Sequence, residues 1–277
     1  MKHAWIAIGS LLVTPSLAVD LQGHRGARGL LPENTLAAFR KALEIGVTTL
    51  EMDCGVTRDG VVVVHHDRRL NPDVARAPDG QWVKAPAPLI RDLDFNQLQT
   101  YDVGRIRPGS EYAKRFPHQQ PVDGARIPRL SEILRFQNVK FNIETKISPD
   151  APQETLPPEA FAMKMVEEIR KAGAEKRTTI QSFDWRTLKV VEREAPEIAT
   201  VYLTTGKDSD PDKVRAAGGK IWSPDFRDLD EEKVRRARGL RVIPWTVNEP
   251  ADIRRVLALK VDGIISDYPD RVKKALP

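Results

Sequence analysis

Two pairs of charged side chains stand two residues apart within apolar surroundings. Glu51 and Asp53 lie in the β-rich run 48–53, and Glu144 and Lys146 end a second apolar run. Residues two apart in a strand share one face, so each pair projects to the same side. Two adjacent carboxylates repel each other unless a cation separates them, and hard cations prefer carboxylate oxygens. The spacing therefore predicts that Glu51, Asp53 and Glu144 bind one divalent metal, Ca²⁺ or Mg²⁺.

A tight turn after the first acidic pair brings a histidine toward these acids. Asp59-Gly60 is a strong signal for a two-residue hairpin loop between two extended runs. With these two residues as the loop, Asp53 lies directly opposite His66 and shares its face. His65 then points the other way. A shift of one residue exchanges the two histidines, so this prediction depends on the turn.

Apolar runs alternate with amphipathic helical patterns along most of the chain. We expect strands at 19–23, 48–54, 139–145, 177–182, 198–203, 220–223, 240–246 and 263–266, and helices at 33–46, 130–136, 158–172, 185–195, 211–217, 230–238, 251–259 and 271–275. A helix after every strand predicts an α/β fold, a (β/α)8 TIM barrel. A doubly wound open sheet is the alternative, but no Gly-x-Gly-x-x-Gly turn supports it. Sites in such barrels form at the carboxyl ends of strands, where His24, Glu51 and Glu144 fall.

The segment 67–127 interrupts this alternation. It is rich in proline and charge, and only 95–101 has a clearly helical pattern. A loop of this length inside a compact domain is usually functional or disordered, and the aromatic residues of this one argue against disorder. We therefore expect an inserted capping segment after strand two, packed over the barrel mouth and shaping the pocket.

The first 18 residues have the pattern of a cleavable signal peptide. A short basic start precedes a mostly apolar run at 4–17, and Ser16-Leu17-Ala18 fits a cleavage site. The run is short for a membrane span and contains Pro15. We expect a barrel domain spanning 19–277 in a bacterial protein that is periplasmic or secreted, with no stable membrane anchor. A retained anchor is the alternative.

The composition is that of a folded enzyme. Of 277 residues, 40% are hydrophobic and 30% charged, which argues against a disordered chain. The formal net charge is +5 without a long run of lysine or arginine, so we expect no nucleic-acid partner. Cys54 is the only cysteine, which excludes an intrachain disulfide. The sequence gives no indication of the oligomeric state.

Short motifs follow one another across nearly the whole chain after residue 18. They are His24-Arg25-Gly26, Pro32-Glu33-Asn34-Thr35, Leu50-Glu51-Met52-Asp53, Thr57-Arg58-Asp59-Gly60 with His66-Asp67, Asn142-Ile143-Glu144-Thr145-Lys146, Gln181-Ser182-Phe183-Asp184, Trp245-Thr246-Val247-Asn248 and Asp262-Gly263-Ile264-Ile265-Ser266-Asp267. In this order they resemble the glycerophosphodiester phosphodiesterase family. Each motif alone is weak, but the ordered set is highly specific.

The resemblance implies a TIM barrel with a metal-dependent phosphodiesterase activity. Such an enzyme hydrolyses small-molecule glycerophosphodiesters to sn-glycerol 3-phosphate and an alcohol. The resemblance also implies that His24 and His66 are its general acid and base, with attack by the glycerol 2-hydroxyl through a cyclic intermediate that water opens. Arg25 can bind phosphate oxygens bidentately, and Lys146 can add a point charge. The order in which the two histidines act stays open.

Some pocket residues and the substrate class have alternatives. Glu33 and Asn34 suit either the pocket or the start of a helix. Gln181 and Trp245 sit at late strand ends and either line the pocket or belong to the core. The alternative activity is that of a lysophospholipase D or C acting on lipid substrates, which requires an apolar groove. A phosphodiester-binding protein without turnover is a third possibility, but binding alone does not require paired histidines.

Overall fold

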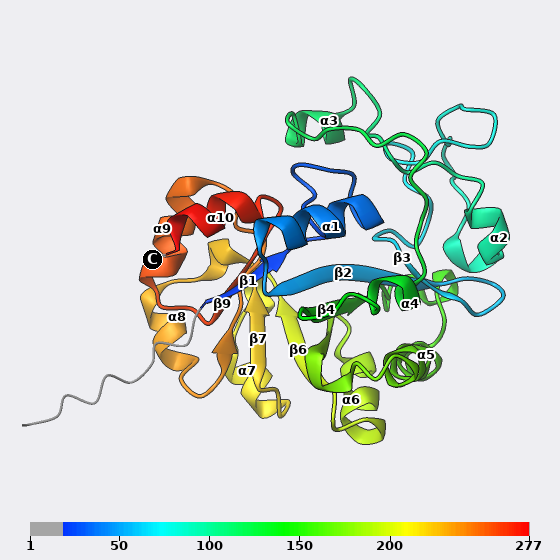
Figure 1. The fold of residues 1–277 in the computed structure, drawn as a ribbon. Helices are drawn as coiled ribbons and strands as arrows, with labels where there is room; N and C mark the ends of the chain where they lie inside the picture. The colour runs from blue at the N-terminus through cyan, green and yellow to red at the C-terminus, as the bar shows by residue number, and fades with distance from the viewer. Residues whose placement is uncertain (1–18, 277) are drawn as a thin grey trace, which may run out of the picture.

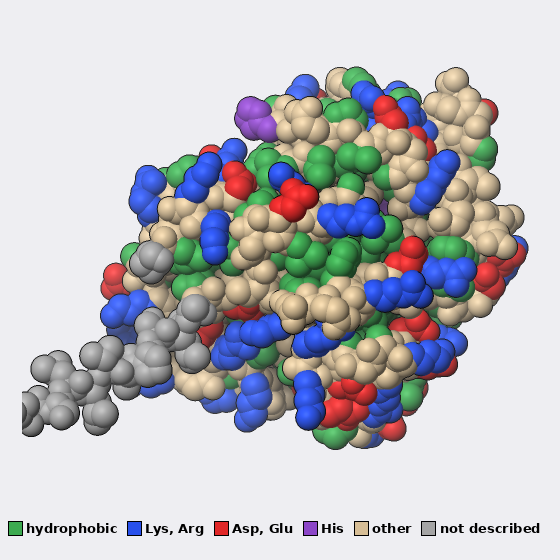
Figure 2. Space-filling model, in the orientation of Figure 1, with side chains coloured by type: hydrophobic (Ala, Val, Ile, Leu, Met, Phe, Trp, Pro, Cys, Tyr) green, Lys and Arg blue, Asp and Glu red, His purple; other side chains and the backbone are tan. Residues whose placement is uncertain are grey.

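The computed structural model describes residues 19–276, so the predicted signal peptide at 1–18 lies outside the described residues. Within this range, strands and helices alternate around a nearly closed barrel (Figure 1). None of the described helices combines the length and the apolar character needed to cross a bilayer. Lysine and arginine side chains are spread among acidic ones over the face shown in Figure 2, in keeping with a modest net charge.

Parallel strands form the barrel wall. Of the nine strands in the described sheet, all but β3 belong to this wall, in the order β8-β7-β6-β5-β4-β2-β1-β9. The wall strands are β1 (Asp20–Gly23), β2 (Thr49–Val56), β4 (Lys140–Thr145), β5 (Thr178–Ser182), β6 (Ala199–Thr204), β7 (Ile221–Pro224), β8 (Arg241–Val242) and β9 (Gly263–Ser266). The prediction of a (β/α)8 TIM barrel is confirmed, with strand ends close to those expected except at β8.

The last wall strand but one is shorter than expected. The sequence predicts a strand at 240–246, whereas β8 has two residues. Pro244 has no N–H to donate to a neighbouring strand, so the regular ladder stops before it. The barrel is closed there by individual bonds: Val247 N donates to Ile265 O, and Ile265 N donates to Pro244 O, both at 3.0 Å.

Helices surround the barrel and cover its outer face (Figure 1). They are α1 (Leu36–Ile45), α4 (Leu130–Ile133), α5 (Pro158–Lys171), α6 (Trp185–Glu194), α7 (Pro211–Ala216), α8 (Glu231–Arg236), α9 (Pro250–Ala258) and α10 (Pro269–Ala275), with short 3₁₀ turns η2 (Pro152–Glu154), η3 (Glu175–Arg177), η4 (Gly206–Asp208) and η5 (Phe226–Asp228). Thr35 caps α1 by accepting from Ala38 N at 3.2 Å, and Gly46 ends it with a φ of +89°. The main hydrophobic core lies between helices and barrel and includes Cys54.

The inward-facing side chains divide the barrel interior into two halves. The polar half, on β1, β2, β4 and β5, contains Gln22, Glu51, Asn142 and Gln181. The apolar half, on β6, β7 and β9 and directly after β8, contains Val201, Ile221, Ile243 and Ile265, which form a hydrophobic cluster of their own. Gln181 pairs with Val201 across β5 and β6, and Gln22 pairs with Ile265 across β1 and β9. One boundary between the halves therefore lies between β5 and β6, and the other lies between β1 and β9.

The hairpin after β2 has a register that differs from the prediction. β3 (Val62–Val64) is antiparallel to β2, and Cys54 lies opposite Val64. His65 N donates to Asp53 O at 2.9 Å, so the prediction that Asp53 lies opposite His66 is wrong by one residue.

The cause of this shift is a three-residue loop. Thr57 Oγ1 accepts from Val61 N at 2.9 Å and donates to Asp59 at 2.5 Å, so the threonine side chain closes the turn. Gly60 follows with a φ of +80°, as the last residue of a three-residue hairpin loop requires. The Asp-Gly pair predicted the position of the turn correctly, but it did not predict the length of the loop.

The inserted segment after β3 has two parts. It contains η1 (Ile90–Asp92), α2 (Phe95–Leu98) and α3 (Glu111–Arg115). The first part packs beside the hairpin and forms a small core with Val63 of β3; its buried members include Leu70, Val74, Val83, Phe95, Leu98 and Val103. The second part carries α3 above the loop that precedes α1 (Figure 1). The segment is therefore a lateral subdomain from which α3 reaches the barrel mouth.

Candidate active site

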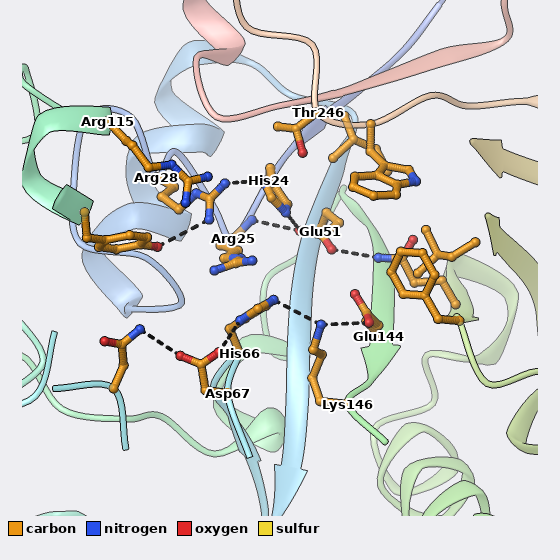
Figure 3. Close-up of a pocket in the computed structure, with 17 residues that line it drawn as sticks. His24, Arg25, Arg28, Glu51, His66, Asp67, Arg115, Glu144, Lys146 and Thr246 are labelled. Carbon is orange, nitrogen blue, oxygen red and sulfur yellow. Dashed lines mark hydrogen bonds and ion pairs between the residues drawn. The ribbon is translucent and has the colours of Figure 1, made fainter. Parts of the chain in front are cut away.

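A cavity of about 430 Å³ opens at the carboxyl ends of the wall strands (Figure 3). Of the residues predicted for the site, those that line it are His24, Arg25, Glu51, His66, Glu144, Lys146, Gln181 and Trp245. Asp53 and Glu33 lie directly behind this lining, each paired with Arg25, and Asn34 bonds to Asp53. The barrel therefore brings residues from both ends of the chain to one mouth.

Three carboxylates meet at the wall of this cavity, two in its lining and Asp53 directly behind. Asp53 pairs with Glu144 across β2 and β4, and Glu51 lies two residues earlier on β2. One oxygen of each carboxylate lies within 4.8 Å of the other two. Asp53 Oδ1 is buried and accepts no hydrogen bond, which is costly for a carboxylate oxygen. This all-oxygen donor set suits a hard divalent cation.

The three carboxyl groups differ in pKa. Burial raises the pKa of Glu51, and the neighbouring Asp53 raises it further. Burial also raises the pKa of Glu144 to about 7, although Lys146 opposes this. Burial alone would raise the pKa of Asp53 as well, but Arg25, His66 and Lys146 hold it well below its usual range. Added positive charge is what would allow all three groups to ionise together.

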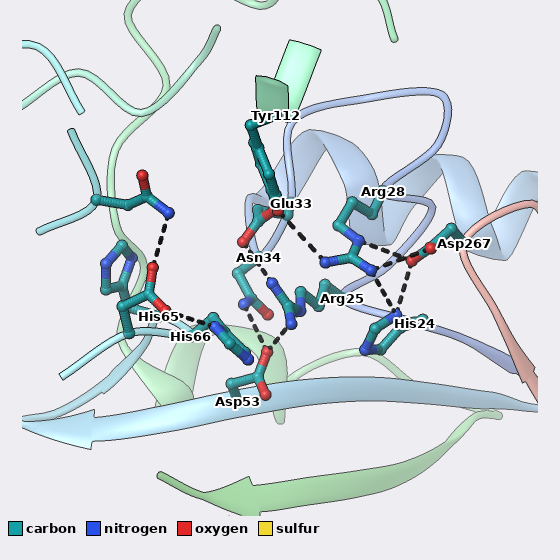
Figure 4. Close-up of polar contacts among 12 residues, drawn as sticks. His24, Arg25, Arg28, Glu33, Asn34, Asp53, His65, His66, Tyr112 and Asp267 are labelled. Atoms are coloured by element: carbon teal, nitrogen blue, oxygen red, sulfur yellow. Dashed lines mark hydrogen bonds and ion pairs between the residues drawn. The ribbon is translucent and has the colours of Figure 1, made fainter. Parts of the chain in front are cut away.

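The loop before α1 holds Asp53 from one side (Figure 4). Arg25 Nε lies 3.1 Å from Asp53 Oδ2, and Arg25 Nη1 donates to Glu33 Oε1 at 2.8 Å. Asn34 Nδ2 donates to Asp53 Oδ2 at 3.0 Å. Glu33 and Asn34 thus belong to the acidic network, since Thr35 is the residue that caps the helix. The Arg25 guanidinium is engaged by two carboxylates while it lines the cavity.

His24 is held by an acid from the end of the barrel. Its Nδ1 donates to Asp267 Oδ1 at 2.7 Å. Asp267 also accepts from Arg28 Nε at 2.7 Å and from Asn248 Nδ2 at 2.8 Å. Burial and Arg28 lower the pKa of His24 to about 4, against the opposing effect of Asp267. The neutral ring therefore turns an unprotonated Nε2 toward Glu51, whose Oε2 lies 3.9 Å away.

His66 reaches the cavity although the predicted register is wrong. β3 ends at Val64, so the two histidines follow a bend rather than the alternation of a strand. His66 Nδ1 donates to Asp67 Oδ1 at 2.7 Å, and its Nε2 lies 3.0 Å from Lys146 Nζ. His65 turns away, with Nε2 at 3.3 Å from Arg69 O (Figure 4).

Lys146 connects His66 to the acids. Its Nζ donates to Glu144 Oε1 at 2.8 Å and lies 3.7 Å from Asp53 Oδ1. Burial opposes the charged form, but Glu144 and Asp53 raise the pKa of Lys146 and keep the ammonium protonated. A cation thus sits between one histidine and two of the three carboxylates.

Several residues of the site were missed by the sequence reasoning. Arg28 and Asp267 hold His24, and Tyr112 and Arg115 of α3 line the cavity. The Tyr112 hydroxyl donates to Glu33 and accepts from Arg28 Nη1 at 3.3 Å. An acid directly after the last strand was a usable signal for Asp267. No pattern in the insertion distinguishes Tyr112 from its other aromatic residues.

The remaining predicted residues lie on the barrel side of the cavity. Gln181 Nε2 donates to Glu51 Oε1 at 2.7 Å, so it acts on an acid of the cluster. Trp245 packs edge to face on Phe183 at 5.4 Å between ring centroids, and both rings form an apolar wall. Ser182 bonds to Thr145 and lies outside the lining.

Comparison with known proteins places this site in a family context. A family model described as "Glycerophosphoryl diester phosphodiesterase family" matches residues 24–271. A glycerophosphodiester phosphodiesterase of Bacillus subtilis is 31% identical over 272 residues, covering 91% of this chain and 85% of that protein. A solved structure from Silicibacter pomeroyi has a TM-score of 0.89 at 36% identity and covers 94% of this chain and 93% of its own.

A second solved structure supports the fold alone. It is a phosphodiesterase from Oleispira antarctica in complex with the product sn-glycerol-3-phosphate. Its TM-score is 0.74 at 23% identity, and the match covers 94% of this chain and 97% of that one.

Proposed function

Since the chain belongs to the glycerophosphoryl diester phosphodiesterase family, we propose that this phosphodiesterase hydrolyses glycerophosphodiesters to sn-glycerol 3-phosphate and an alcohol. The observation that carries the proposal is a cluster of three buried carboxylates in the wall of a cavity that two histidines line. Binding alone requires no acid–base pair, so the two histidines favour turnover. The Oleispira antarctica phosphodiesterase, with sn-glycerol-3-phosphate bound on the same fold, is consistent with this product.

The acidic cluster is the proposed metal site. Glu51, Asp53 and Glu144 would hold one Ca²⁺ or Mg²⁺, in agreement with their oxygen donors and with an Asp53 Oδ1 that accepts no hydrogen bond. When bound, the ion supplies positive charge that neutralises the phosphate oxygens as negative charge develops on them. Lys146 and Arg25 add fixed positive charge on either side of the cluster.

The two histidines are the proposed proton carriers. His24 Nε2 is unprotonated in the neutral ring and accepts the proton of the attacking hydroxyl as the new phosphorus–oxygen bond forms. His66 gives a proton from Nε2 to the alkoxide as the ester bond breaks. This step requires the protonated ring, which burial and Arg25 oppose by lowering the pKa of His66 and which Asp53 and Asp67 favour. It also requires the Lys146 ammonium, 3.0 Å from Nε2, to turn away from that nitrogen. When the glycerol 2-hydroxyl is the nucleophile, water then opens the cyclic product with the two roles exchanged. Asp267 and Asp67 keep both rings oriented throughout.

A substrate panel tests the proposal. The purified protein is incubated with Ca²⁺ or Mg²⁺ and with glycerophosphocholine, glycerophosphoethanolamine or lysophosphatidylcholine. We expect sn-glycerol 3-phosphate from the first two. The lysophospholipase alternative has one supporting feature, the exposed Phe183 beside Trp245 at the cavity edge, where an acyl chain would lie. Turnover of lysophosphatidylcholine alone would favour that alternative, and absence of turnover on all three would contradict both.

The proposed location follows from the first residues. Cleavage after Ala18 would deliver the enzyme to the periplasm or the medium of a bacterium. N-terminal sequencing of the exported protein should begin at Val19. A chain that still begins at Met1 would contradict this proposal without affecting the activity.

A further inference from the structure

A chain of buried side-chain hydrogen bonds crosses the polar half of the barrel, from Glu51 at the mouth to Asp20 at the start of β1. Its links are Gln181 Nε2 to Glu51 Oε1 at 2.7 Å, Asn142 Nδ2 to Gln181 Oε1 at 2.9 Å, Asn142 Nδ2 to Gln22 Oε1 at 2.9 Å, and Gln22 Nε2 to Asp20 Oδ2 at 3.0 Å. We propose that the three amides, called here the amide relay, position Glu51 for metal binding. The inference rests on the proposed function of the acidic cluster.

The far end of the relay fixes its direction. An amide oxygen and an amide nitrogen have similar shapes, so their partners decide which way each group points. Asp20 is acceptor-only as a carboxylate, and its Oδ1 already accepts the hydroxyls of Thr48 at 2.6 Å and Thr49 at 2.7 Å. Gln22 must therefore present its NH₂ group to Asp20 and its oxygen to Asn142.

The middle of the relay follows from the same end, because the oxygen that Gln22 presents requires an N–H group from Asn142. Thr179 Oγ1 donates to Asn142 Oδ1 at 2.8 Å, which leaves both N–H groups of Asn142 for the two glutamines. Gln181 consequently receives a hydrogen bond on its oxygen and can offer only its NH₂ group to Glu51. A reversed Gln181 would place an amide oxygen against a carboxylate oxygen. The orientation at Glu51 is thus determined by contacts that begin at the opposite end of the barrel.

Glu51 is held at both of its oxygens by this arrangement. Gln181 donates to Oε1, and the backbone N–H of Arg25 donates to Oε2 at 2.8 Å. The relay is closed to solvent, because Gln22, Asn142 and Gln181 are at most 2% exposed. Free rotation of the carboxylate is therefore prevented on the side away from the cavity.

Packing alone does not explain these amides. Barrel interiors are mostly filled by branched apolar residues, as the apolar half is here. A buried polar network is advantageous only when every member is satisfied, and each amide of the relay has donor and acceptor partners. Outer partners of metal ligands typically change metal affinity by about 10–100-fold when they are removed. We expect an effect of this size at Glu51.

Metal titration of matched variants tests the relay. Gln181→Met and Asn142→Leu keep side-chain size but remove the donors, and Thr204→Val is the control. Thr204 is buried in the wall of the other half, where its hydroxyl accepts from Trp222 Nε1 at 2.8 Å. Calorimetric titration of each metal-free protein with Ca²⁺ and Mg²⁺ should show a dissociation constant raised about 10–100-fold in both relay variants and within twofold of wild type in the control.

The outcomes separate the relay from the metal site. Unchanged dissociation constants in both relay variants, with native circular dichroism, would reduce the relay to a structural role and overturn the inference. If either variant fails to fold, Gln22→Met replaces it, and an unchanged constant there overturns the inference equally. A wild-type protein that binds neither ion would instead contradict the proposed metal site. Rescue of turnover by excess metal in Asn142→Leu would support positioning, since an added ion cannot repair a misfolded barrel.

Discussion

The two halves of the barrel interior share one backbone geometry but differ in what their side chains do. Gln181 and Val201 are paired neighbours on β5 and β6, yet one contacts an acid of the site and the other belongs to a hydrophobic cluster. In the apolar half, each side chain stabilises the fold because its apolar surface is buried away from water. In the polar half, each group must find a partner, because an unmet buried polar group is costly. The comparison teaches that one barrel backbone can carry two kinds of interior, and that the carboxylate cluster and its amide partners occupy only the polar half.

Removal of divalent ions should cause the largest loss of turnover. The loss should arise in the polar half alone, because the three proposed metal ligands lie there. In excess chelator, turnover of glycerophosphocholine should fall to the rate of the blank, because three neighbouring carboxylates then lack their counter-charge. Circular dichroism should keep its native shape, since the apolar half and the outer core contain no metal ligand. Activity should return when Mg²⁺ or Ca²⁺ is added. Full activity after verified metal removal would contradict the proposed metal site.

Replacement of either cavity histidine should cause the next largest fall in turnover. His24→Ala and His66→Ala should each lower kcat by roughly 10²–10⁴-fold, the usual value of one general acid or base. His65→Ala is the matched control, because His65 is adjacent in sequence but turned away from the cavity. The double variant His24→Ala/His66→Ala should lose less than the product of the single losses, since groups acting as a unit are non-additive.

The opposite ranking at the two neighbouring histidines would contradict this assignment. If His65→Ala lost more turnover than His66→Ala, with both proteins folded, the roles given to the two residues would have to be exchanged.

Tyr112→Phe should have a smaller effect, transmitted from the insertion to the polar half. The variant keeps the ring and removes the hydroxyl that contacts Glu33 and Arg28. A lost hydrogen bond of about 1 kcal/mol corresponds to about a fivefold fall in kcat/KM. Tyr101→Phe, elsewhere in the insertion, is the control. Equal effects of the two substitutions would mean that α3 does not act on the site.

Ile221→Ala should have the smallest effect on turnover and a large effect on stability. Ile221 is a buried member of the apolar half and does not line the cavity. Truncation should lower the free energy of unfolding by about 2–5 kcal/mol, through lost burial and the void that remains. Assays well below the midpoint of thermal unfolding should give kcat within twofold of wild type. A tenfold loss of kcat with unchanged stability would contradict the assignment of stability to the apolar half and of chemistry to the polar half.

The sequence predicted the fold well because periodicity carries the information that a barrel needs. The apolar runs gave every wall strand, and the acids two residues apart on β2 were placed correctly by the alternation of a strand. The hairpin register was not predictable from the Asp-Gly pair, because the Thr57 side chain decides the loop length. His66 was expected in the site through that wrong register and reaches it because β3 ends early.

The parts of the site that could not be predicted depend on distant partners. Arg28 and Asp267 are 239 residues apart, and Arg28 and Tyr112 are 84 apart. Neither pair has a spacing that a local pattern could reveal. The same holds for the amide relay, in which Asn142 and Gln22 are separated by 120 residues. Such contacts become visible only when the strand order of the barrel is known.

The bond between His24 and Asp267 also determines when, during synthesis of the chain, the enzyme can become active. His24 follows β1 and Asp267 follows β9, and these strands pair along four residues of each. During synthesis the first of them leaves the ribosome long before the last, since domains are completed from the N-terminal end onward. A nascent or truncated chain that lacks β9 has no acid to orient His24, so hydrolysis waits until the final strand has docked.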